Sequence, residues 1–293
     1  DRLVGLLESS IDQDDAGAKQ TDIVRLDSFY KHLWSIVNDL LPETGATDPD
    51  SNPSVKRLLV LPFILTEDLY TVTINQTYTS SGDLDAARIA ALLPKLAIAS
   101  RRLSGYPKIF RLIKPLDLSE VVSHIAAASD TGSVEGTIAV DQKDLRDLYT
   151  LFADLDQRST VESTVYLKLR SLPIWQSSRG LVSATKVLLP GNFSDPTGQA
   201  DMLDTSVLTE SSKEFLSTKL EVRTQTIEAF VQTVLPTFFD DDGPLDATKF
   251  TQLINELSNH PALVNDEGIC RMLGSLPMVP TQDGGWSCPV GTY

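Results

Sequence analysis

A short Leu-Pro signature occurs three times along the chain and constrains the fold more than any other feature of the sequence. Each copy places an apolar residue directly after Leu-Pro, and the three Leu residues are 111 and 104 residues apart. Proline removes a backbone donor and favours extended geometry in the residue before it, so each copy predicts the end of a helix or turn and entry into an edge strand. The signature residues are Leu61, Pro62 and Phe63; Leu172, Pro173, Ile174 and Trp175; and Leu276, Pro277 and Met278.

A helical pattern that ends in an acid followed by Leu precedes each signature. The pairs Asp39-Leu40, Asp154-Leu155 and Glu256-Leu257 stand 21, 17 and 19 residues before the signature Leu. Two anchors at similar spacing, three times over, indicate a tandem repeat. The predicted class is therefore α+β: tandem helix plus Leu-Pro β-hairpin units, mostly helical with short antiparallel strands.

The repeat predicts the organisation of the chain. Residues 1–26 form an N-terminal lead-in that can be the end of a preceding domain, and 27–125 form unit one, whose first helix begins the unit. Residues 126–140 form a connector, 141–240 unit two and 241–293 a partial unit three. The chain starts without Met and stops within a strand-like segment, so we expect it to be a piece of a longer polypeptide.

The signature residues admit two roles. Apolar residues at such positions are usually buried, so we expect them in the core. They could instead form a client-binding surface, and the sequence leaves both roles open.

The charge limits the partners. The 25 Lys and Arg residues face 40 Asp and Glu residues, a net charge of −15, which repels phosphate backbones and anionic lipid headgroups. The densest basic pairs, Lys56-Arg57 and Arg101-Arg102, are too short for a nucleic-acid footprint. We therefore expect no nucleic-acid or membrane partner. Cys270 and Cys288 make no disulfide framework, which favours a cytoplasmic or nuclear location over secretion.

Patterns for metal binding and catalysis are missing from the sequence. His32, His124 and His260 lie in different segments without metal-ligand spacing. The acidic turn at 238–244 has Phe at the first position of a calcium loop and Lys249 at the last, where Glu is needed, so we expect it to cap the next helix instead. The sequence thus predicts no catalytic, cofactor-binding or metal-ligating residue.

Three segments of the second copy carry a family resemblance. The run from Leu169 to Trp175, the run from Lys186 to Pro190 and the run from Thr226 to Pro236 resemble the repeats of sacsin and related NO VEIN-type proteins. The resemblance implies a chaperone-like or scaffolding role in a very large intracellular protein that binds protein clients or positions neighbouring domains of the same chain.

The resemblance also implies separate regions with the ATPase fold of gyrase and histidine kinases. This sequence has neither the Asn-bearing helix nor the Asp-x-Gly-x-Gly loop of that fold. No catalytic residue carries over, and we expect a non-catalytic segment without a cofactor.

Two other functions remain open from the sequence. One is an enzyme of unknown class whose site uses carboxylates such as Asp154 and Glu256, although recurrence in every copy favours a capping or packing role. The other is a structural spacer between neighbouring domains.

Overall fold

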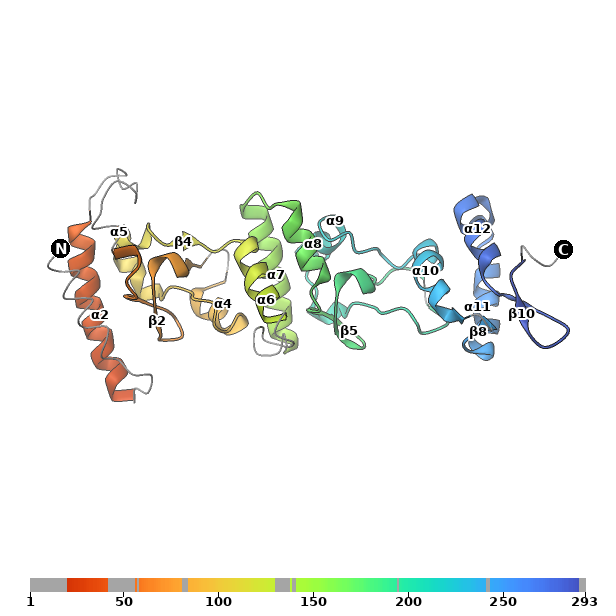
Figure 1. The fold of residues 1–293 in the computed structure, drawn as a ribbon, viewed down its shortest axis with the longest axis horizontal. Helices are drawn as coiled ribbons and strands as arrows, with labels where there is room; N and C mark the ends of the chain where they lie inside the picture. Colours follow the sequence, from red (N-terminus) through yellow and green to blue (C-terminus); the bar gives the residue numbers. More distant parts are fainter. Residues whose placement is uncertain are drawn as a thin grey trace. The chain divides into compact units, whose positions relative to one another are not determined.

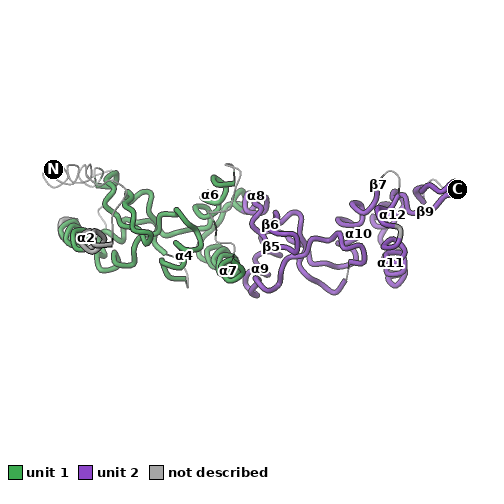
Figure 2. The backbone as a smooth tube through the Cα atoms, turned by 90° about the horizontal axis from the view of Figure 1, so that it is seen from below, with its two compact units in different colours: residues 1–165 green, residues 166–293 purple. Residues whose placement is uncertain are grey.

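The computed structural model describes residues 20–41, 56, 58–80, 84–129, 138, 141–193, 195–240 and 243–289. The chain divides into two compact units, residues 1–165 and 166–293 (Figure 2). Each unit consists of helices and very short strand pairs, mostly antiparallel (Figure 1). The predicted class, α+β and mostly helical, is confirmed. None of the helices in the described ranges combines the length and the apolar character that crossing a bilayer requires.

The first unit begins with the long helix α2 and ends with the helices α6 and α7, which contact one another. Asp85 caps α4 by accepting a hydrogen bond from the backbone N–H of Arg88. Arg88 also bridges Asp144 and Asp147 of α7, so it ties α4 to that helix. The elements of this unit are α2 (Gln20–Leu40), β1 (Ile64–Leu65), β2 (Thr71–Val72), η1 (Ile74–Gln76), β3 (Tyr78–Thr79), α4 (Ala86–Leu92), η2 (Arg101–Gly105), α5 (Pro107–Phe110), β4 (Lys114–Pro115), α6 (Leu118–Ser129) and α7 (Gln142–Arg158).

Trp34 and Phe63 centre one apolar cluster of the first unit. Both side chains have no exposed surface, and the indole Nε1 of Trp34 donates to the carbonyl oxygen of Phe63 at 3.0 Å. The indole therefore buries its apolar body without leaving its N–H unpaired. This contact fixes the first Leu-Pro hairpin to α2.

The second unit contains the rest of the chain from residue 166. Its apolar cluster includes Phe230, Phe238, Leu253 and Ile269. Phe250 and Trp286 join it, with ring centroids 5.0 Å apart. Its elements are α8 (Ser163–Ser171, which crosses the boundary between the units), β5 (Trp175–Ser177), β6 (Gly180–Val182), η3 (Ala184–Lys186), η4 (Thr205–Val207), α9 (Glu210–Thr218), α10 (Ile227–Thr233), η5 (Leu235–Phe238), β7 (Phe239–Asp240), β8 (Gly243–Pro244), α11 (Ala247–Ser258), η6 (Pro261–Asn265), α12 (Glu267–Ser275), β9 (Val279–Pro280) and β10 (Trp286–Ser287).

An antiparallel hairpin follows each Leu-Pro signature. β1 pairs with β2, β5 with β6, and β9 with β10. The backbone N–H of the residue after each proline donates to the carbonyl of the signature Leu, at 3.0 Å for Phe63, 3.0 Å for Ile174 and 2.8 Å for Met278. The same tight turn thus leads into all three hairpins.

Two of the hairpins continue into the same set of backbone pairings. In the first unit, Thr66 bridges Ala99 antiparallel, and Tyr78 bridges Ile98 parallel. In the second unit, Ser177 bridges Leu203 antiparallel. Leu188 bridges Met202 in parallel there.

The next pairing also recurs in both units. The N–H of Leu116 donates to the carbonyl of Thr79 at 3.0 Å, and the N–H of Gln225 donates to that of Leu189 at 2.7 Å. These pairings align the two units residue by residue. In this alignment residue 97 matches 201, residue 114 matches 223 and residue 116 matches 225. These shared pairings support the tandem repeat, which stays a prediction.

The structure changes several expected boundaries. Helix α2 begins at Gln20, seven residues before the predicted start of unit one. Helix α6 continues to Ser129, so the first four residues of the expected connector are helical, while 130–137 and 139–140 lie outside the described residues. Helix α7 belongs to the first compact unit because it packs on α4 and α6, although it opens the second predicted repeat.

The lead-in and one end of the chain are only partly covered. Of the predicted lead-in 1–26, residues 1–19 lie outside the described residues, as do 290–293 of the partial third unit.

The Trp34–Phe63 contact makes a testable prediction. Phe63→Ala should lower the free energy of unfolding of the first unit by about 3–5 kcal/mol, because it removes a fully buried ring. Phe29→Ala on the same helix is the matched control, since Phe29 is 49% exposed, and it should cost less than about 1 kcal/mol. Urea unfolding followed by tryptophan fluorescence measures both; equal costs would contradict the packing.

Candidate functional site

The signature residues lie mostly in the interior of their units. The fractional exposure of Leu61, Phe63, Leu172, Ile174, Trp175 and Leu276 is 9% or less. Pro62, Pro277 and Met278 are half-buried, and Pro173 is exposed. These positions hold the hairpins against the units, and the apolar side chains of the first two copies offer almost no surface to a partner.

A hydroxyl residue five positions after the signature Leu completes each hairpin. The side chain of Thr66 donates to the carbonyl of Tyr70, and that of Ser177 donates to the carbonyl of Gly180 at 3.0 Å. Thr281 hydrogen-bonds the carboxylate of Asp283. Sequence analysis missed these residues, although their constant offset from Leu-Pro was a usable signal.

The three histidines stand apart from one another along the chain and in their contacts. His32 is exposed on α2, and His124 Nε2 lies 3.1 Å from the Pro94 carbonyl. Burial lowers the pKa of His124 against the opposing effect of that hydrogen bond. His260 Nε2 lies 3.6 Å from a carboxylate oxygen of Glu256. Within the described ranges, no three His, Cys, Asp or Glu side chains gather as metal ligands would.

The carboxylates and one of the two cysteines that the sequence analysis considers lie on helices. Asp246 accepts from the backbone N–H groups of Thr248 and Lys249 and caps α11; it follows the acidic turn 238–244 that the sequence analysis expects as the cap, of which residues 241–242 lie outside the described residues. Asp154 lies on α7 in the first unit and Glu256 on α11 in the second. Cys270 is exposed and Cys288 half-buried, and neither forms a disulfide with a described residue.

A groove of about 640 Å³ in the second unit concentrates positive charge. The last turn of α8, the hairpin turn, η3, the segment after α9 and the end of α10 form its walls. Its cations are Arg170, Arg179, Lys186 and Arg223, and its acids are Asp201 and Glu221. The groove is therefore cationic in a chain whose net charge is −15.

Hydrogen bonds hold the three arginines of this cationic groove in place. Arg170 Nη1 donates to Glu221 at 2.8 Å, and Arg223 Nη1 donates to the side-chain oxygen of Gln232 at 3.1 Å. Arg179 Nη2 donates to the carbonyls of Gly198 and Gln199 at 3.0 and 3.3 Å. Each of these contacts uses one terminal nitrogen of its guanidinium, a group with five N–H donors.

Two polar atoms of the groove lack partners. Arg170 Nε and Asp201 Oδ1 are buried and have no hydrogen-bond partner among the described residues. The ammonium of Lys186 likewise makes no hydrogen bond or ion pair with the described part of the chain. Buried polar groups are normally paired, so the walls of this groove are unusual, and the exposed ammonium of Lys186 is available to an anionic ligand.

Glu221, which pairs with Arg170 in the groove, has an energetically unfavourable backbone conformation. Its φ is 52°, in the left-handed region that favours glycine. It follows α9 at the point where the N–H of Val222 bonds back to the carbonyl of Leu216 at 2.9 Å, a helix end at which glycine is usual. A residue kept in an unfavourable conformation while its side chain holds Arg170 points to a functional surface.

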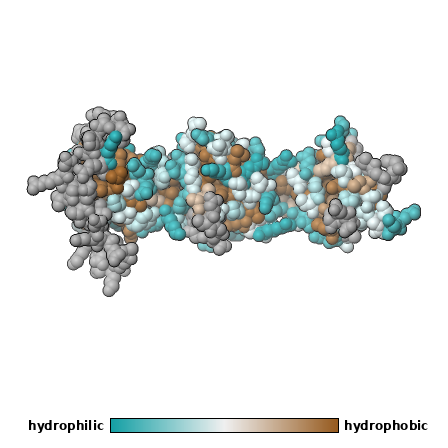
Figure 3. Space-filling model, viewed as in Figure 1, coloured by the Kyte–Doolittle hydropathy of each residue, from teal (hydrophilic) through white to brown (hydrophobic). Residues whose placement is uncertain are grey.

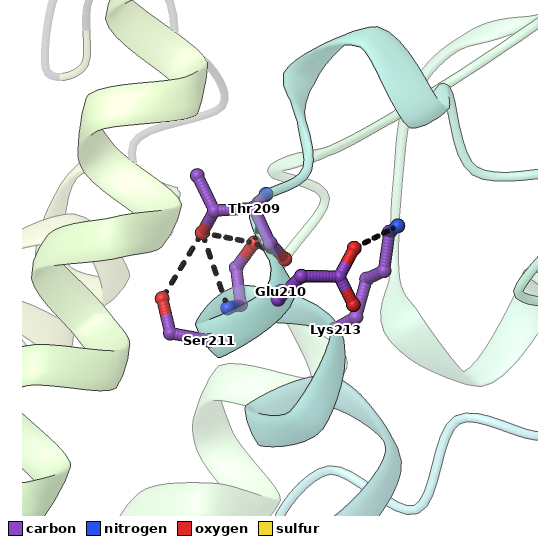
Figure 4. A network of polar contacts seen from close by, with 5 residues as sticks. Thr209, Glu210, Ser211 and Lys213 are labelled. Atoms are coloured by element: carbon purple, nitrogen blue, oxygen red, sulfur yellow. Dashed lines mark hydrogen bonds and ion pairs between the residues drawn. The ribbon is translucent and has the colours of Figure 1, made fainter.

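The two smaller hollows of the second unit are less suited to a ligand. In one, Lys213 pairs with Glu210 at 2.7 Å, and Thr209 and Ser211 bond one another beside it at the start of α9 (Figure 4). In the other, a Cβ on Gly191 would lie 2.0 Å from the carbonyl oxygen of Gln225, so two backbone segments meet there.

Exposed apolar side chains are distributed among hydrophilic ones. On the face shown in Figure 3, hydrophobic patches alternate with hydrophilic residues in both units. The large apolar side chains with most exposure are Phe29, Val60, Leu69, Leu167, Leu245 and Ile254.

The cationic groove was not predicted from the sequence. Its four cations are spread over residues 170–223, whereas the densest basic pairs of the sequence are at 56–57 and 101–102. Only the fold brings these distant cations together.

Comparison with protein-family models, with curated proteins and with solved structures finds no match for this chain.

Replacing Glu221 tests whether this residue serves the groove or the fold. Glu221→Gly should raise the free energy of unfolding of the second unit by up to about 1 kcal/mol, because glycine relieves the left-handed backbone. Glu221→Gln is the matched control: it keeps the backbone cost, removes the charge and should be close to neutral, as exposed ion pairs contribute little. A clear loss of stability in Glu221→Gly, measured by urea unfolding, would mean that the pair with Arg170 holds the fold.

Proposed function

We propose that this chain is a non-catalytic segment of a sacsin-like chaperone or scaffold and that it binds protein clients. The cationic groove carries the proposal: four cations converge on one surface of a strongly acidic chain. The resemblance of residues 169–175, 186–190 and 226–236 to sacsin repeats supports it, since all three segments contribute residues to the groove.

The three arginines that hydrogen bonds already hold in place favour a role in ligand binding. Side chains already held by Glu221, Gln232 and the 198–199 carbonyls lose less conformational freedom when a ligand arrives. A purely structural spacer has no need for preset cations with unpartnered atoms beside them.

The positive charge of the groove, opposite in sign to the net charge of the chain, favours selective binding. The surrounding acids repel acidic surfaces at long range, and the groove attracts an acidic segment only when that segment reaches it. Such a site binds by local complementarity, so its affinity should fall as salt rises.

Aggregation suppression tests the proposal. Chemically unfolded citrate synthase is diluted into buffer with an equimolar amount of this chain, without ATP, and light scattering is followed. The chain should lower the scattering at low salt and do so less at high salt.

Two variants locate the effect. Arg179→Gln, inside the groove, should weaken the suppression. Arg271→Gln should not, because Arg271 is an exposed residue of α12 whose contact is with Glu267. The absence of suppression by the unmodified chain, or equal losses in both variants, would overturn the proposal.

A further inference from the structure

We propose that the cationic groove of the second unit binds an extended acidic peptide segment, whose carboxylates meet the exposed side chains of Lys186 and Arg223. This inference rests on the proposed function and names the chemistry of the segment that is recognised.

The sign of the charge selects the ligand's side chains. Lys186 and Arg223 line the groove with Arg170 and Arg179, and of the two acids Glu221 is already paired with Arg170. Lys186 is exposed at the end of η3 without a side-chain partner in the described ranges. A carboxylate of the ligand can therefore pair with it at little cost in desolvation.

Asp201 limits the charge that the groove can accept. It lines the groove together with the four cations, and it repels a fully ionised phosphate group more strongly than a singly charged carboxylate. A nucleic-acid backbone or an anionic lipid surface is also repelled by the net charge of −15, so a segment with spaced carboxylates fits this groove better.

Apolar side chains shape the groove. Leu188, Val222 and Val234 line it and are at most 8% exposed, so its charged residues carry the recognition. Its volume, about 640 Å³, is within the range of sites that hold small ligands and peptide side chains.

At the described positions that match the groove, the first unit has different side chains on the same backbone pattern. Lys186 ends η3 where Gln76 ends η1. Leu188 N–H bonds the Asp201 carbonyl where Tyr78 N–H bonds that of Ala97. Of the matched positions, only Lys114, which corresponds to Arg223, keeps a positive charge, and it is exposed.

Fluorescence anisotropy of labelled peptides tests the inference. The probes are a peptide of alternating Glu and Val residues and its counterpart with Gln in place of Glu. The chain should bind the Glu peptide at least about tenfold more tightly than the Gln peptide, as expected for charge-assisted hydrogen bonds.

Three variants assign the binding to the groove. Lys186→Glu and Arg223→Glu should each weaken binding of the Glu peptide by about tenfold. Lys114→Glu makes the same change in net charge at the matched position of the first unit, and it should leave binding within about twofold. The side chain of Lys186 has no partner to lose among the described residues, so its variant stays folded, as circular dichroism should show.

Several results would overturn the inference. Equal binding of the Glu and Gln peptides would show that the groove does not recognise carboxylates. A loss of binding in Lys114→Glu as large as in Lys186→Glu would show that only the net charge of the chain matters. Tighter binding of single-stranded DNA, inorganic phosphate or phosphatidylserine vesicles, lost in Lys186→Glu, would assign the groove to another anion.

The two proposals fail separately. Suppression of aggregation without binding of the Glu peptide would remove the acidic specificity alone. Binding of the Glu peptide without any suppression would remove the chaperone-like function and leave a peptide-binding site.

Discussion

The turn at each Leu-Pro dipeptide determines where the hairpin enters the interior. Proline cannot donate a backbone hydrogen bond, and the following N–H turns back to the carbonyl of the signature Leu. In the first two copies this turn carries Phe63 and Ile174 fully inside. A buried hydroxyl, Thr66 or Ser177, then closes the hairpin. The helices pack around a strand pair of only two or three residues because these contacts keep it in place.

The two units place different side chains on the same backbone pattern. The bridges of Thr66 and Tyr78 in the first unit match those of Ser177 and Leu188 in the second. Lys186 ends η3 where Gln76 ends η1, and Asp201 accepts the N–H of Leu188 where Ala97 accepts that of Tyr78. Function can therefore differ between units without a change in the pairings that hold them.

The class of fold could be predicted from the sequence because its main signals are local. Helix periodicity and the Leu-Pro dipeptide act over a few residues. The start of α2 at Gln20 could not, because no cap or break marks it in the sequence. The placement of α7 also depends on contacts with α4 and α6 that are distant in sequence.

The cationic groove escaped prediction for the same reason. Arg170 and Arg223 are 53 residues apart in the sequence, and both line one groove only because the chain returns to it after α9. The conformation of Glu221 was equally hidden, since glutamate gives no sign of a left-handed backbone. Charge counts over the whole chain pointed away from a cationic site.

Hydrogen exchange of single amides, resolved by NMR, tests most directly the backbone pattern on which both units and the groove depend. The amides of Ala99 and Leu203, which bond the carbonyls of Tyr78 and Leu188 at 2.8 and 3.0 Å, should be among the slowest to exchange. The exposed turn residues Asp68 and Ser178 should exchange fast. If Ala99 and Leu203 exchange as fast as these turn residues, the hydrogen bonds to Tyr78 and Leu188 do not stabilise the interior of either unit. That result would contradict the shared backbone pattern.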